Sequence, residues 1–173
     1  MEPEPQGSTR ARAAAAQEQV LCFRLGAEEY GVDVLRVQEI KGWDAVTRVP
    51  YSPAYVLGVI NLRGSIVPVI DLRVRFALPD APFDSTTVIV VVRVPGARGE
   101  RTVGVVVDSV TEVRDFDAAA IRPAPEMPGG AGTAHIRGIG SPDDKLVMIL
   151  DIEGLVTASI AGDDLGETGR EAA

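Results

Sequence analysis

The sequence predicts an all-β fold of two small five-stranded β-barrels, with short helices and flexible tails. Residues 19–157 are dense in β-branched and alternating apolar side chains, most clearly in the run Asp84–Val94. This region also falls into two halves with the same order of patterns. Closing each set of five short strands into a barrel covers its edges. About seventy residues alone give only a marginal core, so we expect the two barrels to pack together.

The clearest single element is a hairpin expected over residues 59–72. Two apolar runs flank a charged, glycine-containing break at Arg63-Gly64, and the second run ends in Asp71. A weaker copy returns in the second half, where these stretches align: Gly31–Ile40 with Gly104–Val113, Gly58-Val59 with Gly138-Ile139, and Ile66–Leu72 with Leu146–Ile152. The second half lacks the Asn-Leu-Arg-Gly sequence of the first. The chain is therefore expected to consist of two related halves.

The other elements follow from local pattern and turn chemistry. Ser52-Pro53 is the clearest helix start, because serine can accept hydrogen bonds from exposed amides and proline fits the first turn. A short closing helix is expected from Glu153. The expected strands are Val20–Leu25, Tyr30–Ile40 with a bend or bulge near Leu35, Asp84–Val94, Arg101–Val113, and a closing hairpin formed by His135–Ile139 and Lys145–Ile152.

The chain ends are expected to be flexible. Residues 1–18 and 158–173 offer no apolar face to bury. The Pro/Gly-rich stretch 123–132 is expected to be an irregular loop. Between the tails, we place the first barrel at about 19–83 and the second at about 84–157, and leave open whether strands cross between the barrels.

Charge and composition exclude several classes of function. The formal net charge is −8 and the arginines are interleaved with carboxylates, so no basic surface for nucleic acid is expected. No stretch of eighteen apolar residues exists that could span a bilayer, and we expect a soluble, cytoplasmic protein. The single cysteine, Cys22, lies in an apolar alternating run and is expected to be a packed core thiol.

Possible catalytic or metal-binding residues are few. Asp71 and Asp151 occupy equivalent places in the two halves, an arrangement similar to the paired carboxylates of a two-lobed aspartic protease. Neither aspartate begins the Asp-Thr/Ser-Gly motif of those proteases. We therefore expect each side chain to cap the turn that comes after it. His135, the only histidine, has no histidine or cysteine companion and is expected on an exposed loop. We therefore expect no enzyme, no cofactor and no metal.

Four stretches together closely resemble the CheW family, the coupling proteins of bacterial chemotaxis. They are Val37–Gly42, Thr47–Pro50, Pro53–Gly64 and Val67–Arg73, within a likeness that covers roughly residues 18–157. The resemblance implies two SH3-like barrels and a non-enzymatic scaffold in two-component signalling. Its partners would be the helical hairpin at the cytoplasmic tip of chemoreceptors and the regulatory domain of the histidine kinase CheA. It would act in the cytoplasm at membrane-associated receptor arrays, without inserting into the membrane.

The resemblance also implies a receptor-binding groove between the barrels. The positions that carry over are Val37, Glu39, Gly58, Asn61 and Arg63, and Glu39 and Arg63 match a pair that forms a salt bridge beside the groove. We expect Glu112, the counterpart of Glu39, to be a solvated strand end. Two alternatives stay open: a CheW-type coupler of a pilus or gliding-motility pathway, and a hydrolase that uses Asp71 and Asp151.

Overall fold

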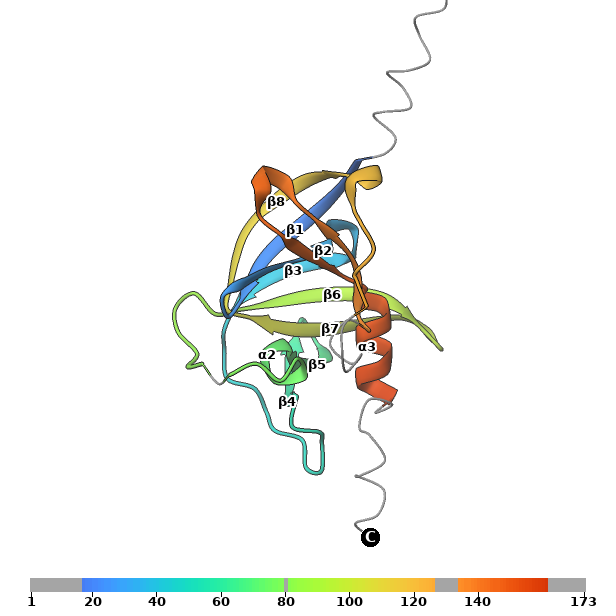
Figure 1. Ribbon diagram of the computed structural model, residues 1–173. Coiled ribbons are helices and arrows are strands. Elements are labelled where there is room, and N and C mark those ends of the chain that lie inside the picture. Colours follow the sequence, from blue (N-terminus) through green and yellow to red (C-terminus); the bar gives the residue numbers. More distant parts are fainter. Residues whose placement is uncertain (1–16, 80, 127–133, 162–173) are drawn as a thin grey trace, which may run out of the picture.

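The computed structural model describes residues 17–79, 81–126 and 134–161, and the described part is mostly β-structure (Figure 1). The strands are β1 (Gln17–Leu25), β2 (Glu28–Asp33), β3 (Val37–Gly42), β4 (Val56–Leu62), β5 (Ser65–Asp71), β6 (Val88–Gly96), β7 (Gly99–Val107), β8 (Ser109–Asp117), β9 (Ile136–Gly140) and β10 (Val147–Leu150). The helical elements are η1 (Val34–Arg36), α2 (Leu72–Arg75), η2 (Ala118–Ala120), η4 (Pro142–Asp144) and α3 (Ile152–Ala161).

The strands form two five-stranded sheets. One has the order β8-β1-β2-β10-β9 and is called here the β1 subdomain; the other has the order β3-β6-β7-β5-β4 and is called the β6 subdomain. A β-bridge of two hydrogen bonds closes each sheet. It joins the segment that follows one edge strand to the edge strand on the opposite side. Thr47 bridges Val59 in the β6 subdomain, and Arg122 bridges Ile139 in the β1 subdomain. The predicted fold of two small SH3-like subdomains is confirmed.

The predicted boundary near residue 83 does not separate the two sheets. The β6 subdomain contains β3, β4 and β5 from before that point and β6 and β7 from after it. The physical reason is strand pairing, because β3 bonds to β6 with Val37 opposite Val92. Each half of the repeat therefore donates its first two strands to one sheet and its last three to the other. The crossing that the sequence left open does occur.

The internal repeat is visible in the pairing of the strands. Each sheet contains one parallel pair, and the same glycine of the repeat lies in each pair. Gly31 on β2 is opposite Ile149 on β10, and Gly104 on β7 is opposite Val69 on β5. The sequence alignment of the two halves therefore also matches the parallel strand pair of one sheet with that of the other.

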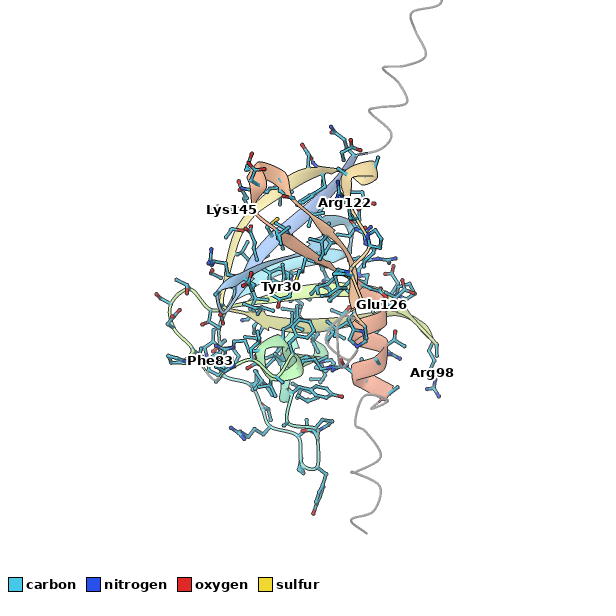
Figure 2. All side chains as sticks on the ribbon, viewed as in Figure 1. Tyr30, Phe83, Arg98, Arg122, Glu126 and Lys145 are labelled. Atoms are coloured by element: carbon cyan, nitrogen blue, oxygen red, sulfur yellow. The ribbon has the colours of Figure 1, made fainter. Side chains whose placement is uncertain are left out.

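Apolar side chains are buried in three clusters. Tyr30 belongs to the large cluster between the sheets, where it stacks on Phe23 and Phe76, and Figure 2 shows it near the middle of the molecule (Figure 2). Smaller clusters lie inside the β6 subdomain and the β1 subdomain. Cys22 is fully buried in the latter, as predicted, and burial raises the pKa of its thiol to about 11. Strand β6 faces two clusters, which explains its β-branched sequence.

Four local expectations need correction. No helix follows Ser52-Pro53; Val56 donates to the Pro53 carbonyl in a tight turn, and β4 begins at once. The bend near Leu35 is the 3₁₀ helix η1, in which the Leu35 amide donates to the Asp33 side chain. The N-terminal tail loses residues 17 and 18 to β1, and the C-terminal tail loses residues 158–161 to α3. Residues 1–16, 162–173 and 127–133, expected as tails and loop, lie outside the described residues.

Candidate functional site

The β4–β5 turn is built by the Asn-Leu-Arg-Gly sequence itself. Arg63 and Gly64 both have left-handed backbones, with φ of 53° and 87°. The Asn61 side-chain oxygen accepts a hydrogen bond of 2.9 Å from the Gly64 amide. Such a turn matches the twist of the two strands that it joins. The turn therefore holds the Arg63 side chain at the tip of an edge hairpin.

Arg63 forms an ion pair with Glu39 across the opening of the β6 subdomain. Its guanidinium donates to the Glu39 carboxylate on β3, the opposite edge strand of the same sheet. The Glu39 side chain is 20% exposed and the Arg63 side chain 74% exposed. An exposed pair of this kind contributes only about 0.2–1 kcal/mol. Its main effect is to fix the hairpin against β3 while most of the guanidinium stays accessible.

Gly58 lies where two segments of backbone approach closely. Its φ is 146°, and an added Cβ would lie 2.1 Å from the Thr47 carbonyl oxygen. The bridge between Thr47 and Val59 explains that approach. Gly58 is buried, so the structure gives it a backbone role, and a contact with a partner stays a prediction.

Val37 is half-buried at the start of β3 and packs against the shared core. Of the five positions predicted for the site, Glu39 and Arg63 are in direct contact and Asn61 supports the same turn. Val37 shares a strand with Glu39, while Gly58 contacts the chain before β4.

The two aspartates of the hydrolase alternative serve as helix caps. Asp71 accepts a hydrogen bond of 2.9 Å from the Arg73 amide at the start of α2. Asp151 accepts one of 3.1 Å from the Gly154 amide in the first turn of α3. Each carboxylate is thus bound to the helix that follows it, as expected. Among the described residues, no three His, Cys, Asp or Glu side chains gather as metal ligands would.

A buried arginine that the sequence analysis did not single out joins the two subdomains. The Arg73 side chain is 5% exposed and contacts Asp71 at 3.3 Å and Asp108 at 3.2 Å. Its guanidinium also lies over the ring of Phe83. Asp108 in turn accepts from the Gly26 amide in the β1–β2 turn. The Asp-Leu-Arg spacing at residues 71–73 was the only local signal, since Asp108 is far away in sequence.

His135 is half-buried rather than exposed, which corrects the expectation from sequence. Its Nε2 lies 3.1 Å from Arg75 Nη2, and Arg75 Nε donates to Ser159 on α3 at 2.9 Å. Burial, followed by the charge of Arg75, lowers the pKa of the imidazole, while Asp151 opposes that shift. The cluster connects α2 and α3 with the chain that enters β9.

The chain is similar to known proteins over nearly all of its folded part. The family model described as the CheW-like domain matches residues 19–159. The chemotaxis protein CheW of Klebsiella aerogenes is 45% identical over 82% of this chain and 82% of its own length.

Two further similarities agree with this match. Protein FrzA of Myxococcus xanthus is 30% identical over 84% of this chain and 91% of its own length. The fold is also similar to the crystal structure of the scaffolding protein TtCheW from Thermoanaerobacter tengcongensis, with a TM-score of 0.73. The match covers 80% of this chain and 91% of that chain, at 34% sequence identity. This chain, with its two closed five-stranded sheets and its Glu39–Arg63 pair, belongs to the CheW family of chemotaxis proteins.

Proposed function

We propose that this protein is a non-catalytic scaffold that couples chemoreceptors to the histidine kinase CheA. The single observation that carries the proposal is the Glu39–Arg63 contact, which holds the β4–β5 turn against β3. The shared core supports the same idea, because two subdomains packed on one core can hold two partners in fixed relative positions. No helix in the described part of the chain has the length and apolar character needed to cross a membrane.

The receptor partner in this proposal is a helical hairpin. An amphipathic helix would lie in the groove that the family resemblance implies, with Glu39 and Arg63 at its rim. The guanidinium of Arg63 remains largely exposed and can donate to a carboxylate or a carbonyl of the helix. Each copy of the protein would bind a receptor with moderate affinity. The many linked copies in an array would raise the overall avidity.

The kinase partner would use a different surface. Each subdomain exposes two apolar side chains at positions that correspond in the repeat. Ile66 is 66% exposed and Leu146 is 63% exposed, while Ile40 is 46% and Val113 is 48% exposed. Exposed apolar side chains that recur in both subdomains favour docking of a regulatory domain that has a double barrel of its own.

The test is co-sedimentation of the purified protein with a receptor cytoplasmic fragment and CheA. We expect a ternary complex, and we expect Arg63→Glu to remove the protein from the receptor pellet without changing its circular dichroism. Arg98→Glu is the matched control, because Arg98 is exposed at the tip of the β6–β7 hairpin (Figure 2). Retained binding by Arg63→Glu at physiological salt would contradict the assignment. A coupler of a pilus or gliding pathway predicts no complex with the chemoreceptor fragment at all.

A further inference from the structure

A groove opens at one end of the β1 subdomain, on the other sheet from Glu39 and Arg63. Its volume is about 760 Å³. Ile139 and Leu146 supply apolar lining, and the Leu146 side chain is 63% exposed. Asp115 and Asp117 add two carboxylates, against the single cation Arg122. The groove therefore suits a segment with small side chains and positive charge.

The described chain begins at the wall of this groove. Gln17, the first residue of β1, is opposite Asp117, and Glu18 is opposite Phe116. Both Asp117 and Phe116 line the groove. Figure 1 shows the start of β1 beside the end of β8. Whatever precedes Gln17 in the chain is therefore tethered within a few residues of the lining.

The sequence immediately before β1 has the composition that the groove suits. Residues 10–16 are Arg-Ala-Arg-Ala-Ala-Ala-Ala, with two cations, five small apolar side chains and no carboxylate. This is unusual in a chain whose net charge is −8. Seven extended residues reach about 23 Å, which is ample for a groove whose wall begins at the next residue.

We propose that residues 10–16 dock in this groove, with Arg10 and Arg12 facing Asp115 and Asp117 and the alanines covering Leu146. The occupant is the chain's own N-terminal segment, so it would compete with any other polypeptide, including a kinase domain, for this end of the β1 subdomain. Exposed ion pairs are individually weak. A short tether, however, provides an effective concentration in the millimolar range, so weak contacts are enough for reversible docking. The inference does not depend on the proposed function.

The test uses a nitroxide on the full-length protein. Ala14→Cys provides a selective attachment point, because Cys22 is fully buried and its raised pKa keeps the thiol unreactive. We expect the methyl NMR signals of Ile139 and Leu146 to broaden several-fold more than that of Ile66. Ile66 is the internal control, since it is equally exposed at the corresponding position of the other subdomain.

Two further measurements complete the experiment: removal of the two arginine charges, and a mixture of separately labelled proteins. Arg10→Gln with Arg12→Gln in the labelled protein should abolish the selective broadening, and Arg98→Gln with Arg101→Gln should leave it unchanged. Equal broadening of Leu146 and Ile66, or broadening that survives loss of both tail arginines, would overturn the proposal. A mixture of spin-labelled protein and isotope-labelled protein should show no broadening. Its appearance there would assign the groove to a second copy and would also overturn the proposal.

Discussion

The two hairpins at the edges of the subdomains both place two left-handed residues in their turns, and these residues differ in charge. Arg63 and Gly64 have φ of 53° and 87°, and the corresponding Asp143 and Asp144 have φ of 55° and 61°. The Asp143 side chain is 81% exposed, close to the 74% of Arg63. The β6 subdomain thus presents a cation at this turn, and the β1 subdomain presents an anion.

The contacts across the two openings are reversed in the same way. Arg63 in the first turn meets Glu39 on β3, while Asp143 in the second turn lies 3.6 Å from Arg114 on β8. Glu112 is exposed, with 53% of its side chain accessible, and it accepts from Arg114 Nε at 2.6 Å. An ion pair between turn and edge strand is therefore common to both subdomains. What distinguishes them for a partner is the sign of the exposed charge.

The largest expected effect concerns Arg73 and Glu153, which lie two positions after the helix-capping aspartates Asp71 and Asp151. Arg73 is buried among Asp71 and Asp108, whereas its counterpart Glu153 forms an exposed pair with Arg36 at 3.4 Å. Arg73→Leu leaves two carboxylates without their cation and should lower the free energy of unfolding by about 3–5 kcal/mol. Glu153→Leu should change it by less than about 1 kcal/mol. Chemical denaturation measures both, and similar losses would contradict this difference.

The second test compares the two glycines before the closing bridges. Gly58→Ala places a Cβ against the Thr47 carbonyl at a φ of 146°, so it should cost about 2–3 kcal/mol of unfolding free energy. At Gly138 the nearest atom to an added Cβ is the Ile121 methyl Cγ2 at 2.5 Å, a side-chain atom that can move, and the Arg122 oxygen is 3.0 Å away. Gly138→Ala should therefore cost less. Thermal or chemical unfolding ranks the two variants, and the reverse order would refute the backbone role of Gly58.

The third test separates the ion pair from the charge that it displays. Exchanging Glu39 and Arg63, as Glu39→Arg with Arg63→Glu, keeps a pair between β3 and the turn but reverses the exposed charge. We expect receptor binding to fall at least about tenfold, which is roughly 1.4 kcal/mol, with unfolding free energy almost unchanged. Asp143→Arg, the matched change in the other turn, should leave receptor affinity unaltered. Full binding by the exchanged variant would mean that the pair matters only for its geometry.

Local pattern identified the β-rich segments, but it did not identify every break between strands or any strand's partner. The single strand predicted over Arg101–Val113 is two strands, β7 and β8, in different sheets, and the one predicted over Tyr30–Ile40 is divided between β2 and β3. The equivalence of Gly31 and Gly104 was predicted from spacing, and the structure places both in parallel pairs at the centres of the sheets. The exchange of strands between subdomains was left open because alternation reports which face of a strand is buried and not which neighbour it bonds. The pairings between strands of the two halves reveal it, such as Val37 opposite Val92 and Gly104 opposite Val69.

The candidate site shows the same division between local and distant information. Arg63 and Asn61 belong to one turn, and their sequence already marks that turn. Arg73 depends on Asp108, thirty-five residues later, and nothing in the sequence around either residue announces the contact. Ser52-Pro53 has the chemistry of a helix start, yet tertiary pairing begins β4 at Val56 and leaves no room for a helix.

The smallest expected effect is a pH dependence of stability that arises from His135, at the entry to β9. The pKa of His135 is lowered by burial and by Arg75, so the unfolded chain binds this proton more readily than the folded one. Stability should therefore rise with pH from the lowered pKa of the folded state up to the ordinary histidine range near 6.5, and fall on acidification through that window. Tyr55, the residue that corresponds to His135 in the repeat, is buried and donates to the Ser159 carbonyl at 2.6 Å. His135→Gln should flatten the slope of unfolding free energy between about pH 5 and 7. An unchanged slope would show that carboxylates, rather than this histidine, govern acid stability.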